Sequence, residues 1–345
     1  MQRYPIQTLT DLSSETPPGR APANPTPQKR SPATLLLKLC LFAASFAAGI
    51  HFYFTWVQDG DWIHAKFSAP PSPSLIIGSS RGQMGLQPSI FSDSRLEFER
   101  PLYNFCFNGA AKFGPDYYRH VMSKVKPGTR HGLFIIEVGP LLFAAKSANA
   151  HADSSTFVES NSFVRSKVVP PGRINYDYLF KYFDDSYYRP LFMKALGKRG
   201  KIKRSADGWV DAEIQPMDSA THAKRVADKV KHYKADYFPG EELAPLRLEY
   251  LKRMATELGK MGRVVLVRTP IDPEMLRAET EFLPEFDSLM VSMADELSIT
   301  FLNFSNSSLR DSTYDGSHLY SQSARTLCNW IVDSLAGDGR RASVE

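Results

Sequence analysis

Cysteine is scarce in this chain of 345 residues: there are three, and none belongs to a Cys-x-x-Cys pair. No group of histidines and cysteines has the spacing of zinc ligands, so the sequence disfavours a structural metal and offers no metal site. The phosphate-binding Gly-x-x-x-x-Gly-Lys-Ser/Thr loop and the Gly-x-Gly-x-x-Gly turn are both missing. With no cofactor motif in the sequence, we expect any chemistry to be carried out by the side chains themselves.

Strong charge of one sign is also missing, since the formal net charge is only +5. No block of basic residues interleaved with aromatic residues runs through the chain, so we expect no nucleic-acid partner. A hydrophobic content of 43% is enough for a substantial core in one large domain or two small ones. Residues 1–33 are rich in Pro, Ser and Thr and lack apolar periodicity, which predicts a disordered tail; a second short tail is expected at 337–345.

One long apolar run, residues 34–57, is interrupted only by Lys38 and His51. Roughly 20 such residues cross a bilayer as a helix, so the run predicts a transmembrane anchor. Basic residues precede it, whereas Asp59 and Asp61 follow it. The positive-inside rule then predicts a single-pass protein of the inner (cytoplasmic) membrane, with its N-terminus in the cytoplasm and its C-terminal domain in the periplasm.

Two alternatives to the anchor remain open at this point: a cleaved signal peptide, because small residues occur around 43–48, and a buried core helix. Export would allow Cys106 and Cys328 to pair in an oxidising compartment. Each of these cysteines also suits a buried apolar position.

The rest of the chain has the pattern of an α/β domain, predicted at residues 75–336 after a Pro-rich tether at 58–74. Five short apolar runs resemble buried strands, at 75–77, 102–106, 132–138, 264–267 and 300–302. Helical patterns alternate with them, starting at Pro115 and over 242–261, 281–297 and 321–335. The alternation predicts a flavodoxin-like three-layer sandwich around a mainly parallel five-stranded sheet. An insertion at about 147–240 is too long for a simple crossover and is expected to form a lid or substrate platform.

A first polar motif, Gly-Ser-Ser-Arg-Gly at 78–82, follows the first predicted strand directly. Ligands of open parallel sheets bind beyond the carboxyl ends of the strands, so Ser80 is placed as a nucleophile would be. Alternatives are a polar turn in which Ser79 or Ser80 caps a helix, or a loop that binds an anion.

A second motif, Asp-Gly-Ser-His at 315–318, precedes the last predicted helix. His318 could take the proton of Ser80, with Asp315 orienting its imidazole as in a serine hydrolase triad. A capping aspartate beside a surface histidine is the alternative. The two motifs lie at the start and end of one α/β unit, where a parallel sheet can bring them together.

These two motifs resemble the first and last sequence blocks of the SGNH/GDSL hydrolase superfamily. Ser79 stands where most members have Asp, and Tyr-Asn-Phe-Cys-Phe-Asn-Gly-Ala-Ala at 103–111 is similar to the second block. The resemblance implies that the backbone N–H groups of Ser80 and Gly109 form an oxyanion hole. The third block, normally Gly-x-Asn-Asp, is not recognisable at 137–141, and Asn108 is a candidate substitute for its donor.

The membrane anchor and the Gly-Ser-Ser start resemble one branch more closely, the DltD-like and alginate O-acetylation-like proteins of envelope acyl transfer. This resemblance covers about 75–140 and 263–335, and implies a membrane-bound O-acyltransferase as partner and an acyl-bearing carbohydrate or lipid as substrate. Two further residues are candidates for binding substrate: Arg81, unless it is solvated or ion-paired, and Glu137 at the end of the third strand.

The hypothesis from sequence is therefore a periplasm-facing serine esterase or O-acyltransferase acting on envelope polysaccharide or lipid. The alternative is a catalytically silent protein of the same fold that assists envelope assembly or binds glycan. A run of Lys and Arg at 194–204 is expected to be a solvated loop or a contact for anionic lipid or polysaccharide.

Overall fold

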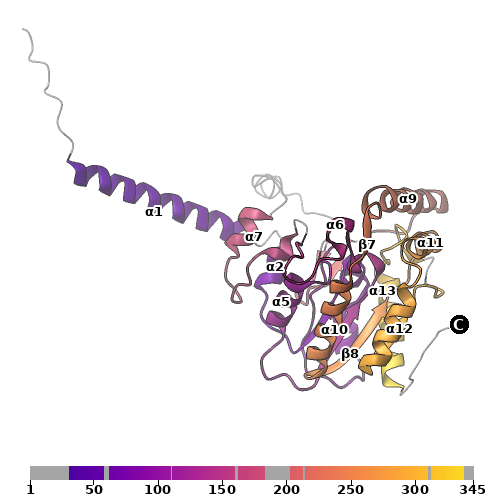
Figure 1. Cartoon of the computed structure of the whole chain (residues 1–345). Helices are drawn as coiled ribbons and strands as arrows, with labels where there is room; N and C mark the ends of the chain where they lie inside the picture. Colours follow the sequence, from indigo (N-terminus) through magenta and orange to yellow (C-terminus); the bar gives the residue numbers. More distant parts are fainter. Residues whose placement is uncertain are drawn as a thin grey trace, which may run out of the picture. The chain divides into compact units, whose positions relative to one another are not determined.

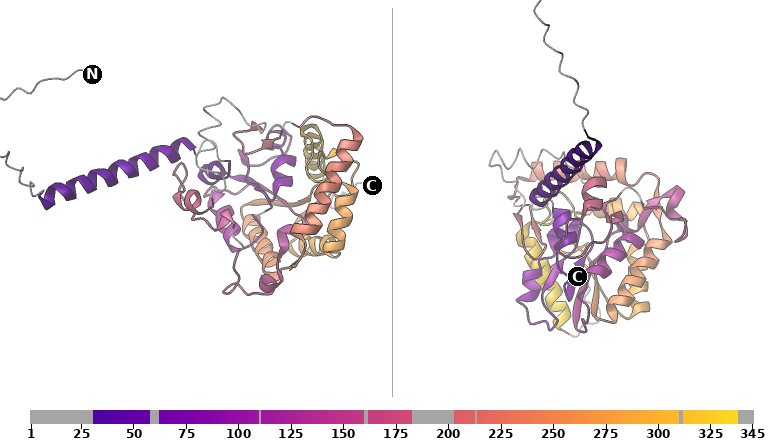
Figure 2. Two further views of the ribbon diagram at one scale, coloured as in Figure 1. Left: turned by 90° about the horizontal axis from the view of Figure 1, so that it is seen from above. Right: turned by 90° about the vertical axis from the view of Figure 1, so that its left-hand side faces the viewer.

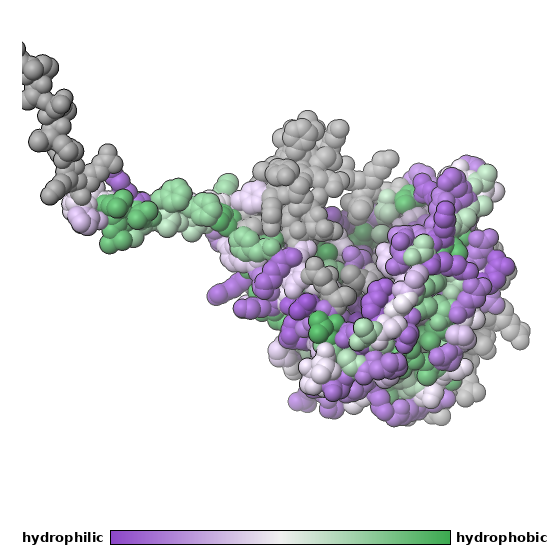
Figure 3. Space-filling model, turned by 45° about the horizontal axis from the view of Figure 1, so that its top comes forward, coloured by the Kyte–Doolittle hydropathy of each residue, from purple (hydrophilic) through white to green (hydrophobic). Residues whose placement is uncertain are grey.

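In the computed structural model, the first described element is one long helix, α1 (Pro32–Val57) (Figure 1). The residues that the structure describes are 31–57, 62–109, 111–159, 162–182, 203–212, 214–309 and 312–337. In these ranges α1 is the one helix long and apolar enough to cross a membrane: Pro32–Tyr53 has a mean hydropathy of 1.9 and buries no side chain. The face of this helix that Figure 3 shows is mostly apolar, whereas the visible face of the domain is mixed. A signal sequence near an N-terminus would have the same properties.

A five-stranded, wholly parallel sheet forms the centre of the domain, in the order β2-β1-β3-β8-β9. The strands are β1 (Ser74–Ile77), β2 (Leu102–Asn104), β3 (Gly132–Glu137), β8 (Gly262–Arg268) and β9 (Thr300–Asn303). Every residue of β1 and β3 is buried, as their continuous apolar sequences require. The predicted five-stranded parallel sheet and flavodoxin-like fold are confirmed, and the topological switch lies between β1 and β3, where such folds bind ligands.

Helices cover both faces of this sheet (Figures 1 and 2). One layer contains α3 (Ser80–Gly85), α4 (Pro88–Ser92) and α13 (Ser321–Ala336); the other contains α5 (Pro115–Lys124), α10 (Pro245–Gly259) and α12 (Phe286–Leu297). An apolar cluster of buried residues joins the first layer to the sheet and includes both Cys106 and Cys328. Both cysteines are buried and free, so they take the apolar positions that were the alternative to a disulfide.

Part of the predicted tether at 58–74 belongs to the folded domain. It contains α2 (Trp62–Ser68), in which three side chains are buried. The ammonium group of Lys66 donates hydrogen bonds to the backbone carbonyls of Asn104 and Cys106, both at 2.7 Å. Burial lowers the pKa of Lys66 to about 7. The two hydrogen bonds of Lys66 fix α2 to the carboxyl end of β2. The proline content of the segment gave no indication of this packing.

The helix predicted over 281–297 begins only at Phe286, as α12; residues 281–282 are the end of a separate helix, α11 (Pro273–Phe282), which was not predicted. Pro284 separates them, because the residue before a proline avoids the helical conformation. The helix predicted from residue 242 begins at Pro245, since Glu241–Leu243 forms strand β7 instead.

Strand β7 pairs antiparallel with β4 (Ala144–Lys146) and so closes the base of the insertion predicted at about 147–240. Within it, the structure describes α6 (Ser147–Ala150), η3 (Phe163–Arg165), α7 (Tyr176–Lys181), the paired strands β5 (Lys203–Arg204) and β6 (Val210–Asp211), α9 (Ser219–His232) and η4 (Tyr233–Tyr237). The basic run at 194–204 lies outside the described residues except for Lys203 and Arg204.

Candidate active site

Ser80 is the first residue of α3, directly beyond the carboxyl end of β1. The capping role belongs to its neighbour, because Ser79 Oγ accepts a hydrogen bond from the backbone N–H of Arg81 at 3.2 Å. The alternative in which the motif is only a capped turn therefore applies to Ser79, and the hydroxyl of Ser80 remains available for another partner.

That partner is His318. Its Nε2 lies 2.8 Å from Ser80 Oγ, and its Nδ1 lies 2.8 Å from Asp315 Oδ2. The other carboxylate oxygen of Asp315 accepts hydrogen bonds from the backbone N–H groups of Ser317 and His318, at 3.1 and 2.9 Å. The structure thus brings together the serine, base and acid that were predicted from motifs more than 230 residues apart, at the hydrogen-bond distances a serine nucleophile requires.

The protonation states of the pair suit a base that is ready to accept a proton. Burial opposes the ionised form of Asp315, but the hydrogen bond and charge of His318 and the charge of Lys229 outweigh it and hold the pKa of Asp315 well below its usual range. Burial also lowers the pKa of His318; the hydrogen bond to Asp315 opposes this change, whereas the charge of Lys229 adds to it. A neutral imidazole beside a carboxylate carries its proton on Nδ1 and leaves Nε2 free to accept one.

Lys229, on α9 of the insertion, is the site residue that the sequence analysis missed. Its Nζ donates to Asp315 Oδ2 at 2.5 Å and lies 3.0 Å from His318 Nδ1. The signal in the sequence is weak: His222, Val226 and Lys229 recur at the four- and three-residue spacing of one helix face. Nothing in that spacing says which part of the sheet edge the face would meet.

Glu137, predicted as a candidate for binding substrate, supports the nucleophile loop instead. It is fully buried at the end of β3, and its Oε2 accepts the backbone N–H of Ser79 at 2.6 Å. The glycine at 78 is required here: its φ is +148°, and a Cβ would lie 2.6 Å from Glu137 Oε2. Burial raises the pKa of Glu137, although Arg81 and the Ser79 N–H act in the opposite direction.

Arg81 is buried in an ion pair, the alternative to substrate binding that the sequence left open. Its guanidinium donates to Glu279 Oε1 at 2.5 Å, and Glu279 also accepts from Arg268 at 3.2 Å. Burial would raise the pKa of Glu279, but the charges of the two arginines lower it. Glu279 belongs to α11, so this ion pair joins the nucleophile helix to a helix that the sequence analysis did not predict.

The predicted oxyanion-hole residues Asn108 and Gly109 lie in an exposed turn after β2. The chain runs beside the nucleophile loop just before them, because Phe107 N–H donates to Gly78 carbonyl at 3.0 Å and Phe105 N–H donates to Ile76 carbonyl at 2.7 Å. Their position next to the loop is compatible with the expected role. Donation to an oxyanion stays a prediction.

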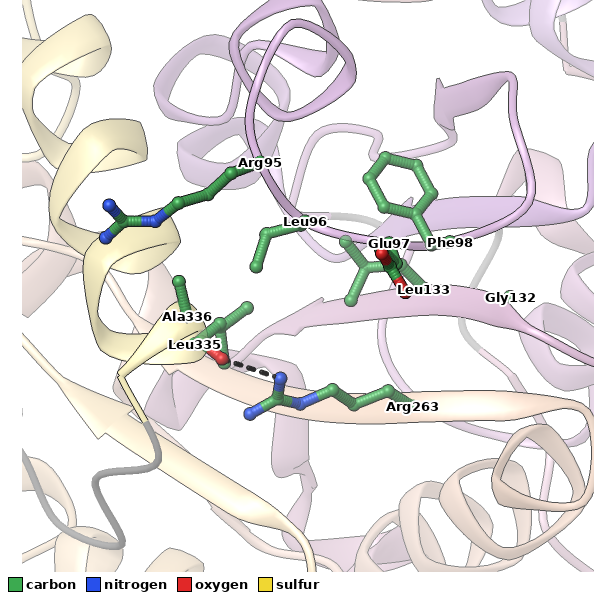
Figure 4. Close-up of a pocket in the computed structure, with 9 residues that line it drawn as sticks. All are labelled: Arg95, Leu96, Glu97, Phe98, Gly132, Leu133, Arg263, Leu335 and Ala336. Atoms are coloured by element: carbon green, nitrogen blue, oxygen red, sulfur yellow. Dashed lines mark hydrogen bonds between the residues drawn. The ribbon is translucent and has the colours of Figure 1, made fainter.

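A surface hollow of about 340 Å³ lies at the opposite edge of the sheet (Figure 4). Gly132, at the start of β3, and Arg263, near the start of β8, both line it, and Arg263 donates to the Leu335 carbonyl at 2.8 Å. Because the strands are parallel, this hollow is a full strand length from Ser80 and has no part in the chemistry of the triad.

Comparisons with known proteins leave the family open. No family model matches the chain, and no curated protein matches it. Among solved structures, a carbohydrate acetylesterase from Sinorhizobium meliloti is similar over 76% of this chain and 98% of its own, with a TM-score of 0.32 and 14% sequence identity. A similarity this low carries no weight for activity, so the function proposed below is inferred from the geometry of the site.

Proposed function

We propose that this chain is a serine esterase or O-acyltransferase that acts on ester groups of cell-envelope carbohydrate or lipid. The observation that carries the proposal is the continuous hydrogen-bonded series Ser80–His318–Asp315, with both links at 2.8 Å. Such a series activates a hydroxyl for attack on a carbonyl carbon. The resemblance to the SGNH/GDSL superfamily implies the same chemistry.

The proposed reaction has two steps. His318 Nε2 accepts the proton of Ser80 as Oγ attacks the ester carbonyl, and the N–H groups of Ser80 and Gly109, with Asn108 as a candidate third donor, stabilise the oxyanion. Collapse of this intermediate expels the alcohol, which takes the proton from His318, and leaves an acyl group on Ser80. Water or a sugar hydroxyl then gives its proton to His318 as its oxygen attacks the acyl carbonyl. Collapse of this second intermediate breaks the bond to Ser80 Oγ, which takes the proton back from His318, and releases an acid or a new ester.

The place of the reaction is part of the proposal. With α1 as a single-pass anchor in the inner membrane and the N-terminus in the cytoplasm, the domain would face the periplasm, as the charges on either side of α1 favour. A membrane-bound O-acyltransferase is the partner that the resemblance implies, and it would supply the acyl group that Ser80 passes on.

A second candidate function, a catalytically silent assembly or glycan-binding protein, is favoured by one observation. The segment at 137–141 has no asparagine, whereas proteins of the SGNH/GDSL superfamily, which this chain resembles, normally carry an oxyanion-hole asparagine in their third block. Loss of one oxyanion donor costs about 100- to 1000-fold in rate, so a protein of this kind can retain a triad and turn over very slowly.

The experiment that separates these functions uses the full chain in detergent. We expect hydrolysis of 4-nitrophenyl acetate, or transfer of its acetyl group to an added oligosaccharide, that is lost in Ser80→Ala and retained in Ser89→Ala, a change at an exposed serine of α4. Acetyl transfer with little release of acetate identifies a transferase. If the chain neither hydrolyses the ester nor transfers its acetyl group but does bind glycan, the catalytically silent alternative is established.

A further inference from the structure

Three residues of α9 pack against the loop that carries the base. His222 Nε2 lies 2.7 Å from the carbonyl oxygen of Thr313, and a Cβ added at Gly316 would lie 3.2 Å from Val226 Cγ1. Lys229 follows on the same helix face and reaches Asp315. This helix face therefore contacts the loop at three successive points, and Lys229 makes the contact that lies at the triad.

The helix itself is held in place by independent contacts with α11, its neighbour in Figure 1. Beyond its C-terminus, Lys234 pairs with Glu281 at 2.6 Å, and the ring of Phe238 stacks on Phe282 with centroids 4.4 Å apart. These contacts do not involve the triad, so the packing of the insertion holds α9 beside the base loop independently of the ion pair between Lys229 and Asp315.

The hydrogen-bond arrangement decides what the lysine does. Asp315 Oδ2 is shared by two donors, Lys229 Nζ and His318 Nδ1. If Lys229 donated to Nδ1, the imidazole proton would move to Nε2 and His318 could not act as a base. In that arrangement the lone pair of Nδ1 would face the Asp315 carboxylate 2.8 Å away, which is unfavourable. The anionic acceptor therefore keeps the proton on Nδ1, and the ammonium group acts on His318 through its charge.

We propose that Lys229 is a positioning residue of the triad: it holds the Asp315 carboxylate and, as a like charge beside the imidazole, keeps His318 neutral and able to act as a base in mildly acidic surroundings. This inference rests on the proposed function for its catalytic consequence. Its electrostatic part concerns the imidazole alone and does not depend on any substrate.

Other groups around the imidazole act with or against this effect. Asp315, on the same loop, favours the charged imidazole, whereas Arg81 on α3 disfavours it. The ring of Tyr314 stacks on that of His318 with centroids 5.6 Å apart, and Ser80 faces Nε2. Both cations are ion-paired, Arg81 with Glu279 and Lys229 with Asp315, but Lys229 Nζ lies only 3.0 Å from His318 Nδ1, so its removal changes the field at the ring directly.

The test compares Lys229→Met with Lys229→Arg and with Lys224→Met, a matched control on the same helix whose lysine is exposed and paired with Asp228. Ionisation of His318 is followed by NMR on the full chain labelled at histidine, with the signal assigned by its loss in His318→Gln. The pH dependence of kcat/KM for 4-nitrophenyl acetate is measured on the same proteins.

We expect His318 to become protonated at a higher pH in Lys229→Met than in the wild type, because a neighbouring like charge has been removed. The ratio of the kcat/KM of this variant to that of the wild type should be about tenfold lower at pH 5.5 than at pH 8, because removal of one nearby charge typically changes a protonation equilibrium by about that factor. Lys229→Arg should restore most of the activity at low pH, and Lys224→Met should match the wild type.

Titration of His318 at the same or a lower pH in Lys229→Met would overturn the proposal, and so would higher activity of that variant at pH 8. If the wild type hydrolyses and transfers nothing, the proposed function fails, yet the NMR titration still decides whether Lys229 keeps the imidazole neutral. The two failures are therefore distinguishable.

Discussion

Replacing Asp315 by Asn isolates the chemical role of the carboxylate, because the structure fixes the orientation of the new amide. In the wild type, Oδ1 accepts the backbone N–H groups of Ser317 and His318. An amide oxygen at the position of Oδ1 keeps these two hydrogen bonds and places the amide NH2 at the position of Oδ2. Lys229 then loses its acceptor there, but its Nζ lies 3.0 Å from His318 Nδ1 and can donate to that nitrogen instead. Donation to Nδ1, from the amide or from Lys229, moves the imidazole proton to Nε2, so Nε2 can no longer accept the proton of Ser80.

The expected loss is large, since the base is held in its inactive tautomer. Aspartate-to-asparagine replacement in a serine triad lowers kcat by about 10⁴, which corresponds to about 5.5 kcal/mol of transition-state stabilisation. The loop should keep its conformation, because both backbone hydrogen bonds to Oδ1 survive.

The assay is the initial rate of 4-nitrophenyl acetate hydrolysis at pH 7.5, with thermal unfolding as a check on folding. Asp295→Asn, at an exposed position of α12, is the matched control and should retain the wild-type rate. A folded Asp315→Asn protein that works within tenfold of the wild type would refute the role assigned to the carboxylate.

Three further outcomes are expected. Burial raises the pKa of Glu137 above its ordinary value of about 4.5, so the folded protein retains a proton that the unfolded chain releases, and the free energy of unfolding falls as the pH rises above that value. Glu137→Gln keeps the acceptor for Ser79 N–H without this proton, so its melting temperature relative to that of the wild type should rise between pH 4.5 and 8. Gly82→Ala places a Cβ 2.8 Å from Cys106 Sγ and should cost about 1–3 kcal/mol of unfolding free energy in urea, whereas Gly259→Ala, with nothing within 4 Å, should cost less than half of that. Thiol titration of the denatured chain without reductant should find three free thiols; a single one would show a disulfide.

The sheet could be predicted from the sequence because its signal is local. Strands β1, β3 and β8 each contain a short continuous apolar run, such as Phe134–Ile136 in β3, and the stretches between the predicted strands have helical periodicity. The helix predicted at 281–297 was started too early, because the apolar periodicity continues across Pro284 into the end of α11, and α11 itself was missed.

The triad could be predicted because its two motifs follow strands of one parallel sheet, whose carboxyl ends share an edge. The supporting residues could not, since their roles depend on tertiary packing. Glu279 meets Arg81 only because α11 folds over the nucleophile helix, and Lys229 meets Asp315 only because the insertion returns to the base loop. A single charged residue on an amphipathic helix has the same appearance in sequence whether it faces solvent or a catalytic carboxylate.

The central claim is that Ser80 is the nucleophile, and the most direct measurement is the site of covalent labelling by a fluorophosphonate ester. The full chain in detergent is treated at pH 7.5, digested and examined by peptide mass spectrometry. We expect one label per chain, on Ser80, with labelling at least 100-fold slower in His318→Gln and absent in Ser80→Ala. Labelling of Ser80→Ala at the wild-type rate, or of another serine in the wild type, would contradict the account.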